Sequence, residues 1–424
     1  MVPVPTRRNQ VSVIGLGYIG LPTAAFLAST GLKVLGCDIN KERVDTINSG
    51  VVPFVEPGFE KLLADVVHDG TLTAATEPTP SDAFIIAVPT PFKGGNKVDD
   101  KYVMAAAETI APLLRGNELV ILESTSPPGL TELIGKRIIE LRPDLTLEPN
   151  AASSIYLAHA PERVLPGKIM EEMTANARIV GGLNKEASKR VQALYSRFCD
   201  GEILLTDART AEMAKLTENA FRDVNIAFAN ELSLICDDLD INVWELIELA
   251  NHHPRVNILQ PGPGVGGHCI AVDPWFIVSS SPDYSNLIKT AREVNDSKPE
   301  YVIKQVTEAI AKQKADGTTP SIAVLGLTFK PNIDDLRESP AVEILSRLAS
   351  EYCEIKFIVV EPNISELPTE FSYSPNISLH KLNEALALST ISLLLVDHKE
   401  FKFNRDLLRT QPLLIDTRGL TADN

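Results

Sequence analysis

The chain has 424 residues, of which 44% are hydrophobic and 23% charged, and it carries a formal net charge of −16. This composition is ordinary for a globular protein, and the length predicts two or three domains. The acidic balance argues against nucleic acid or an anionic membrane surface as a partner, and no apolar run is long enough to predict a membrane span. A local cluster of Lys and Arg could still bind an anionic small molecule.

The cysteines and the start of the chain indicate a cellular compartment. The first ten residues lack the apolar core of a signal peptide. The five cysteines are scattered without CxxC spacing, which favours a reducing cytoplasm over a disulfide framework or a zinc site. Cys37 and Cys236 lie in predicted elements and are expected to pack in the core. We therefore predict a cytoplasmic protein without a metal centre.

The first half of the chain alternates short β-rich runs with helical patterns, which predicts a parallel sheet with helices on both faces. Gly15, Gly17 and Gly20 form a GxGxxG motif between the first strand and its helix. The first glycine permits a tight turn, the second lets a pyrophosphate approach, and the third lets helix and strand pack closely. The predicted strands cover residues 11–15, 33–37, 83–88, 119–122 and 155–158.

Several side chains at strand ends extend this dinucleotide site. Asp38 ends the second strand, where it can accept hydrogen bonds from a ribose 2′-hydroxyl and so favours NAD over NADP. Arg43 lies nearby, one turn into the next helix. Ligands of open sheets bind at the carboxyl ends of strands, which makes Val88, Thr90 and Thr125 candidates to touch the nicotinamide half. Proline-rich strand exits are also common as plain turns.

A long helix is predicted next, capped by Thr206 or Asp207 and running to about residue 239. Lys215, Asn219 and Arg222 stand at i, i+4 and i+7, on one helical face. A solvated polar stripe is the ordinary explanation of such a pattern. The helix is otherwise apolar, however, and a desolvated lysine can donate to an oxyanion. More helix is predicted over residues 243–250 and 285–297.

A glycine-dense run over residues 262–267 precedes Cys269, and Asp273 follows four residues later. Glycines let the backbone lie against a ligand, and a thiolate held there is a strong nucleophile. A tight turn with an inert buried cysteine is the alternative. A helical turn starting at Cys269 would give the thiolate dipole stabilisation. Alternatively, Asp273 caps a later helix with Pro274 at its first position, and Lys215 is then the expected source of activation.

The β pattern returns after a polar break over residues 315–320, with strands predicted at 322–325, 355–360, 391–396 and 413–415. This part echoes the first: a glycine turn at Gly326 follows one strand, and Glu361 ends the next. We predict an α/β protein with two Rossmann-like doubly wound domains joined by a central helical region with a long spine helix. The predicted domains are 1–205, which binds NAD, 206–315, the helical dimerisation region, and 316–424, the second Rossmann-like domain.

Seven motifs together resemble the UDP-glucose/GDP-mannose dehydrogenase family over nearly the whole chain. They are GLGYIGLP, AVPTP, ESTSPPG, APERVLPG, KLTENAFRDVNIAFANE, PGPGVGGHCIAVDP and GLTFKPNIDDLRESPA. The resemblance implies a four-electron oxidation of a sugar C6 alcohol to a carboxylate, with two NAD molecules used in succession. Cys269 would add to the intermediate aldehyde as a thiohemiacetal, which loses a second hydride to give a thioester that water hydrolyses.

The resemblance also implies roles for single residues. Lys215 would support the oxyanion or move a proton at C6, Asn219 would hold the same oxygen, and Asp273 would position water or Lys215. Glu162 would activate water, with a loop salt bridge as the alternative, and Thr125 would place water or the nicotinamide. The implied NAD contacts are Gly15, Gly17, Tyr18, Ile19, Gly20, Asp38, Arg43, Val88, Thr90, Thr125 and Arg337. The implied UDP-sugar contacts are Arg163, Val164, Lys215, Asn219, Arg222, His253, Arg255, Gly266, Phe329, Lys330 and, more weakly, Arg418, for which a solvated side chain is the alternative.

Partner and substrate follow from the same resemblance. The segment with His253 and Arg255 would reach the substrate of a neighbouring subunit, which implies a homodimer at least. UDP-glucose members of the family tend to carry an acid where this chain has Pro166, which fits a sugar with an N-acetyl group. We expect UDP-N-acetyl-D-mannosamine as substrate, oxidised to its uronate for bacterial surface polysaccharide. UDP-GlcNAc, UDP-glucose and GDP-mannose are alternatives, and a one-step β-hydroxyacid dehydrogenase or a non-catalytic NAD-binding protein are remoter ones.

Overall fold

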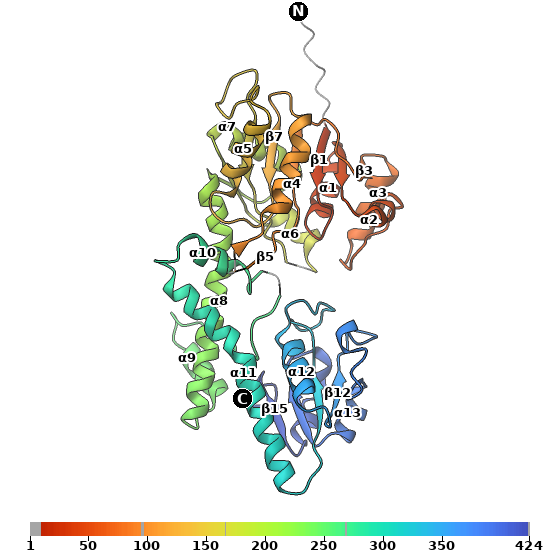
Figure 1. Ribbon diagram of the computed structural model, residues 1–424, viewed down its shortest axis with the longest axis vertical. Helices are drawn as coiled ribbons and strands as arrows, with labels where there is room; N and C mark the ends of the chain where they lie inside the picture. Colours follow the sequence, from red (N-terminus) through yellow and green to blue (C-terminus); the bar gives the residue numbers. More distant parts are fainter. Residues whose placement is uncertain (1–9, 95–96, 166, 268, 423–424) are drawn as a thin grey trace, which may run out of the picture. The chain divides into compact units, whose positions relative to one another are not determined.

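The computed structural model describes residues 10–94, 97–165, 167–267 and 269–422 (Figure 1). Pro166 and His268 therefore lie outside the described residues. The chain divides into two compact units, Met1–Thr217 and Glu218–Asn424, and the division falls within the long helix α8 (Ala208–Asp238).

The first unit is built on an eight-stranded sheet with the strand order β10-β9-β8-β7-β4-β1-β2-β3. Neighbouring strands pair in parallel, apart from the antiparallel pair β8 and β9. The chain runs outward from β1 in both directions, so the carboxyl ends of β1 and β4 flank the point where the order reverses. The strands are β1 (Gln10–Ile14), β2 (Lys33–Cys37), β3 (Leu72–Ala75), β4 (Ala83–Ile86), β7 (Leu119–Leu122), β8 (Tyr156–His159), β9 (Arg178–Gly182) and β10 (Ile203–Asp207).

Helices cover both faces of this sheet because its strands are apolar on both sides. Val11 and Val13 of β1 face one core, whereas Ile14 belongs to the other. The first core is closed by α1 (Gly20–Ser29), α3 (Phe59–His68), α6 (Ile169–Ala175) and α7 (Lys185–Tyr195). The second is closed by α4 (Lys101–Ile110) and α5 (Leu130–Leu141). The remaining elements are α2 (Lys41–Asn48), the 3₁₀ turn Ala111–Leu113, and the hairpin of β5 (Phe92–Lys93) and β6 (Lys97–Val98).

The second unit combines helices with a five-stranded parallel sheet of order β13-β12-β11-β14-β15. The strands are β11 (Ser321–Leu325), β12 (Lys356–Val360), β13 (Ile377–Leu379), β14 (Ile391–Leu394) and β15 (Leu414–Asp416). One face packs on α11 (Asn286–Ala315) and α12 (Pro340–Glu351), and the other on α13 (Leu382–Leu388), α14 (Lys399–Phe403) and α15 (Arg405–Arg409). The remaining elements are α9 (Val243–Asn251), α10 (Asp273–Ser280) and the 3₁₀ turn Thr369–Phe371. Among the described residues, every helix is too short or too polar to cross a bilayer.

The predicted fold class is confirmed, and the differences concern single elements. The helix predicted over 285–297 is α11, which runs to Ala315 with Pro299 inside it. The predicted helix ended at residue 297 because residues just before a proline, here Pro299, are biased away from the helical conformation. Of the two proposed caps of α8, Asp207 accepts a hydrogen bond from the backbone N–H of Thr210 (3.0 Å). The strands β3, β9, β10 and β13 were not predicted, because each mixes polar or small residues with its apolar ones.

Candidate active site

In the GxGxxG turn after β1, two of the glycines leave no room for a side chain, whereas the third borders open space. Gly15 has a φ of +95°, and a Cβ placed on it would lie 2.7 Å from the carbonyl oxygen of Ala87. A Cβ on Gly20 would lie 1.9 Å from the carbonyl oxygen of Gly15, whereas a Cβ on Gly17 meets nothing within 4 Å. The space over Gly17 faces the start of α1, where free N–H groups favour an anion. This cradle fits the pyrophosphate of a dinucleotide.

Asp38 is held rigidly at the end of β2. Its carboxylate accepts hydrogen bonds from the backbone N–H groups of Leu16 (3.0 Å) and Asn40 (2.9 Å). The Arg43 guanidinium, predicted to lie nearby, forms an ion pair with it at 2.9 Å. The side chain is nearly buried, so an acceptor is fixed beside the glycine turn where a ribose hydroxyl would bind.

The exits of β4 and β7 bring together the three predicted positions Val88, Thr90 and Thr125. The hydroxyl of Thr90 donates to the carbonyl oxygen of Thr125 (2.8 Å), and Ser124 donates to the carbonyl oxygen of Val88 (2.7 Å). Because β4 lies beside β1 in the sheet, these residues border the glycine turn at the carboxyl edge.

Tyr18 directs its hydroxyl to the carboxylate of Glu56 and packs its ring against Phe54, with 4.8 Å between ring centroids. The same carboxylate accepts hydrogen bonds from the backbone N–H groups of Gly167 and Ile169, both at 2.8 Å. Glu56 is fully buried and thus ties the loop after residue 165 to the glycine turn. Glu56 could not be predicted from the sequence, since no spacing rule connects it to a loop more than a hundred residues later. Ile19 is the residue directly before α1.

Glu162 lies in a buried ion pair with Arg178, at 2.8 Å. The Arg178 guanidinium stacks over the rings of Tyr195 (5.1 Å) and Phe198 (5.0 Å). This is the salt bridge that the sequence analysis kept as its alternative, and the partner comes from β9, a strand that was not predicted. The neighbouring Arg163 donates to the carbonyl oxygen of Ala177 (2.8 Å), and the half-buried Val164 packs against the first core.

Glu123 completes this buried polar cluster and was also missed. Its carboxyl group accepts hydrogen bonds from Thr23 (3.0 Å) and Tyr195 (3.1 Å). Burial, and next the nearby carboxylate of Glu162, raise the pKa of Glu123 to about 8. The residue was visible in the ESTSPPG motif, but sequence alone did not show that its side chain turns into the interior.

The glycine-dense loop of the second unit brings Cys269 to the surface. Gly264 and Gly267 adopt φ values of +145° and +82°. A Cβ on Gly266 would lie 2.4 Å from the carbonyl oxygen of Glu338 and 2.8 Å from the Cβ of Phe329, so the turn packs tightly on the segment after β11. The thiol of Cys269 is exposed, whereas burial raises the pKa of the Cys37 thiol to about 12. The thiol is therefore accessible, and the alternative of a buried cysteine is wrong.

The start of α10 distinguishes the two proposals for the cysteine turn. The helix begins at Asp273 with Pro274 in its first turn, and the carbonyl oxygen of Cys269 accepts from the N–H of Asp273 (2.9 Å). The helix thus begins after the cysteine, as the second alternative held, while the same hydrogen bond closes one helical turn that starts at Cys269, as the first alternative held. Asp273 was predicted to cap this helix, but it is the first helical residue, and Val272 occupies the cap position. The buried Asp273 carboxylate instead accepts from the amide of Asn219 (2.5 Å).

The long helix α8 carries the remaining predicted side chains and anchors the glycine loop. Lys215 is half-buried and belongs to the first unit, where its charge lies near the buried ring of His159. Arg222 is exposed. About two turns beyond, Asn230 accepts from the N–H of Gly262 (2.8 Å) and donates to Asn295 of α11 (2.8 Å).

The last predicted contacts lie in loops of the second unit. Phe329 packs on Gly267, and Lys330 is half-buried beside it. Arg337 is exposed and paired with Asp335 (2.6 Å). Arg418, whose alternative was a solvated side chain, is half-buried, lies 3.2 Å from Asp397 and donates to the carbonyl oxygen of Pro261 (3.4 Å). His253 and Arg255 are exposed, with the N–H of Arg255 donating to the His253 ring (3.3 Å).

No group of three or more His, Cys, Asp or Glu side chains that could hold a metal ion occurs among the described residues. Glu361 holds the position in the second sheet that Asp38 holds in the first. Each acid accepts from the backbone N–H after the glycine turn (Leu327 and Leu16) and from the N–H two residues after itself (Asn363 and Asn40). They differ in their side-chain partners, because Glu361 is engaged by the buried His398 (3.0 Å) and Asp38 by Arg43.

Comparison with protein families gives three matches in chain order. Residues 9–199 match the NAD binding domain of the UDP-glucose/GDP-mannose dehydrogenase family, residues 209–297 its central domain, and residues 323–423 its UDP binding domain.

Similar curated proteins and solved structures agree with these matches. UDP-N-acetyl-D-mannosamine dehydrogenase of Campylobacter jejuni is 56% identical over 93% of this chain and 96% of its own length. An NDP-N-acetyl-D-galactosaminuronic acid dehydrogenase of Ralstonia nicotianae is 53% identical over 97% of this chain and 96% of its own length. The structure of the UDP-N-acetyl-mannosamine dehydrogenase of Staphylococcus aureus covers 98% of this chain and 96% of its own, with 42% identity and a TM-score of 0.85.

Proposed function

Because this chain belongs to the UDP-glucose/GDP-mannose dehydrogenase family, we propose that it oxidises UDP-N-acetyl-D-mannosamine at C6 to UDP-N-acetyl-D-mannosaminuronate, using two NAD per turnover. The observation that carries the proposal is the exposed thiol of Cys269 on a glycine turn, next to the buried pair of Asp273 and Asn219. A one-step alcohol dehydrogenase has no use for a presented nucleophile, whereas oxidation to an acid can use one to hold the aldehyde between two hydride transfers.

The chemistry assigned to this chain's residues has four parts. Lys215 and Asn219 support the C6 oxygen as the proton leaves and the first hydride departs. The Cys269 sulfur then adds to the aldehyde carbon, giving a thiohemiacetal that still carries one C6 hydrogen. Loss of that hydrogen as a second hydride gives a thioester. Water, placed by Thr125 or Asp273, hydrolyses the thioester and regenerates the thiol. Glu162 is proposed as the base that activates this water on the resemblance alone, since its carboxylate is paired with Arg178.

NAD, when bound, accepts each hydride. The cradle over Gly17, the start of α1 and the fixed carboxylate of Asp38 fit its pyrophosphate and ribose. The remaining proposed NAD contacts are Gly15, Tyr18, Ile19, Gly20, Arg43, Val88, Thr90, Thr125 and Arg337. Arg337 belongs to the second unit and is proposed on the resemblance alone.

For the nucleotide sugar, the proposed contacts lie mainly in the family's central and UDP binding domains. They are Arg163, Val164, Lys215, Asn219, Arg222, Gly266, Phe329, Lys330 and Arg418, with His253 and Arg255 reaching a neighbouring subunit of a homodimer. The exposure of His253 and Arg255 supports that last assignment. We further propose three domains, 1–205, 206–315 and 316–424, and a reducing cytoplasm, which suits the five free cysteines.

The choice of sugar rests on the similar proteins, since several at 53% to 56% identity are named UDP-N-acetyl-D-mannosamine dehydrogenase. The relative from Ralstonia nicotianae supports a second candidate, a nucleotide-linked N-acetylgalactosamine sugar. The test is NAD reduction by the purified protein with UDP-N-acetyl-D-mannosamine, UDP-N-acetyl-D-galactosamine, UDP-GlcNAc, UDP-glucose and GDP-mannose in turn. We expect the highest kcat/KM for the first. Turnover of another sugar with none of UDP-N-acetyl-D-mannosamine would refute the assignment.

A further inference from the structure

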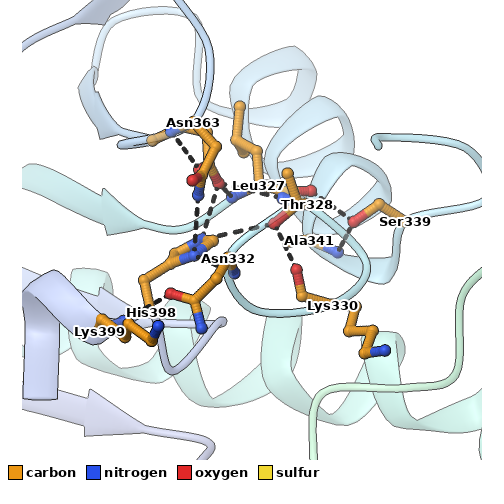
Figure 2. A network of polar contacts seen from close by, with 10 residues as sticks. Leu327, Thr328, Lys330, Asn332, Ser339, Ala341, Asn363, His398 and Lys399 are labelled. Atoms are coloured by element: carbon orange, nitrogen blue, oxygen red, sulfur yellow. Dashed lines mark hydrogen bonds and ion pairs between the residues drawn. The ribbon is translucent and has the colours of Figure 1, made fainter. Parts of the chain in front are cut away.

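A buried polar cluster lies at the carboxyl edge of the second sheet, where no sequence motif placed one. It joins the exits of three neighbouring strands, β12, β11 and β14. Glu361 follows β12, Thr328 follows β11, and His398 follows β14. Figure 2 shows Thr328 and His398 with the labelled residues of the loop that they contact. All three side chains are at least nine-tenths buried, with 4%, 1% and 1% of their surface exposed. A cluster so deeply buried is fixed by its hydrogen bonds.

The hydrogen bonds define which nitrogen of His398 carries the proton. Its Nδ1 accepts from the backbone N–H of Asn332 (3.0 Å) and lies 3.1 Å from the amide nitrogen of Asn363. A backbone N–H can only donate, so Nδ1 carries no proton. Nε2 therefore carries it and donates to Glu361 (3.0 Å).

These contacts hold both ends of the loop that follows β11. At its start, the N–H groups of Leu327 and Thr328 donate to Glu361, at 2.7 and 3.2 Å. At its end, Asn332 has a φ of +63°, donates from its N–H to His398, and accepts from the N–H of Lys399 (2.9 Å). Inside the loop, the Thr328 hydroxyl donates to the carbonyl oxygen of Lys330 (2.9 Å).

The same loop supports the cysteine turn. Cβ atoms placed on Gly266 and Gly267 would lie 2.8 and 2.7 Å from the Cβ and ring of Phe329. Phe329 is packed against the glycine backbone without a gap, so a shift of the loop would displace the glycine turn as well. His398 thus holds a loop that contacts the cysteine turn through Phe329 and also carries Lys330.

We propose that His398 is a positioning residue for the nucleotide sugar: its neutral ring, bridging Glu361 to the N–H of Asn332, fixes the loop 327–332 so that Lys330 and Phe329 meet the diphosphate. This inference rests on the proposed function. It also accounts for a difference between the two Rossmann-like sheets. Both acids accept from the backbone N–H that follows the glycine turn, but Glu361 is also bonded to a buried histidine, whereas Asp38 pairs with the partly exposed Arg43.

Variants of His398 can remove its hydrogen bonds to Asn332 and to Glu361 one at a time. In His398→Asn, the amide oxygen can take the place of Nδ1 and accept from Asn332. In His398→Gln, the amide nitrogen can take the place of Nε2 and donate to Glu361, but Asn332 loses its acceptor. His398→Ala removes both. His380→Ala is the matched control, because His380 also follows a strand of this sheet but bonds only locally, to Ser378 (3.1 Å) and Glu384 (3.5 Å).

The measurement is the affinity of the full-length protein for UDP and, separately, for NAD, by titration calorimetry, with the thermal midpoint recorded for each variant. We expect UDP to bind about tenfold more weakly to His398→Gln and His398→Ala, as for one lost hydrogen bond, while His398→Asn stays near the wild type. NAD affinity should be unchanged throughout. In turnover, KM for the nucleotide sugar should rise more than kcat falls.

Equal UDP affinity in the wild type and in folded His398→Gln would overturn the inference, and so would a wild type that binds no UDP. A general loss of folding would lower both affinities and the thermal midpoint together in every His398 variant, His398→Asn included, and that result would also overturn it. UDP binding requires no turnover, so failure of the wild type to oxidise any nucleotide sugar would contradict the proposed function without affecting this comparison.

Discussion

Cys269 is the residue on which the proposed chemistry depends most, and its exposure distinguishes it from Cys37, Cys199 and Cys236. In Cys269→Ser the hydroxyl is a weaker nucleophile, and the alkoxide that its acyl ester must expel is a poorer leaving group than a thiolate. We expect acid formation to be abolished and NAD binding to stay within about twofold of the wild type. Product analysis by mass spectrometry measures the acid. Cys353→Ser, at the other exposed cysteine, should leave it unchanged, and uronate formation at the normal rate by Cys269→Ser would contradict the mechanism.

Lys215 is proposed to act on the C6 oxygen. Its partial burial near the uncharged His159 makes its ammonium group a stronger donor than a solvated one. Lys215→Ala should lower kcat at least about a hundredfold, as the loss of an oxyanion donor does. The exposed Lys189 of α7 offers a control, since Lys189→Ala should keep the full rate. A near-normal kcat in Lys215→Ala would show that the lysine is only structural.

At the scale of elements, the turn between β1 and α1 separates glycines needed by the fold from the glycine needed by the ligand. Gly20→Ala should destabilise the protein by about 1 to 3 kcal/mol, because its Cβ would overlap the carbonyl oxygen of Gly15. Gly17→Ala should leave the thermal midpoint unchanged, since its Cβ points into open space, but should weaken NAD binding about tenfold or more. Calorimetry and NAD titration of both variants check this. Normal NAD affinity in Gly17→Ala would refute the placement of the pyrophosphate.

The same scale shows what sequence can and cannot predict. The strands of the first sheet nearest its centre were predicted within two residues, because they are largely apolar and alternate with helical patterns. The strand β9 was missed because Arg178 and two glycines interrupt its apolar pattern. Without β9 the partner of Glu162 could not be known. The length of α11 was missed because the packing of Val302, Val306 and Ile310 on the second sheet overrides the local effect of Pro299.

At the scale of the whole molecule, the buried cluster of Glu123, Glu162 and Arg178 makes stability depend on pH. The folded state raises the pKa of Glu123 from 4.5 to about 8, chiefly by burial. The folded protein therefore binds the Glu123 proton more tightly than the unfolded chain does. This difference stabilises the folded state fully below about pH 4.5, and the stabilisation is lost as the pH rises through 8. Each rise of one pH unit between 4.5 and 8 lowers the free energy of unfolding by at most about 1.4 kcal/mol.

Glu123→Gln keeps a neutral side chain of the same shape and removes this titration. We expect the free energy of unfolding of the wild type to fall relative to that of the variant between pH 5 and pH 8, measured by urea unfolding at several pH values. Parallel curves for the two proteins would mean that Glu123 is already ionised in the folded state.

Two Rossmann-like sheets in one chain were predictable from the strand and helix periodicity, and so was the candidate NAD site, because its motif is local in sequence. The two buried networks were not predictable. Each joins residues at the ends of separate strands, such as Glu361 with His398 and Glu162 with Arg178. Only the strand order of the folded sheet brings them together.

The most direct test of the proposed function counts reducing equivalents. Wild-type protein is incubated with a limiting, known amount of UDP-N-acetyl-D-mannosamine and excess NAD, and NADH is measured by absorbance when the sugar is exhausted. A thiol that holds the aldehyde for a second oxidation predicts two NADH per sugar and a uronate product. One NADH per sugar, with an aldehyde or ketone as product, would contradict the account.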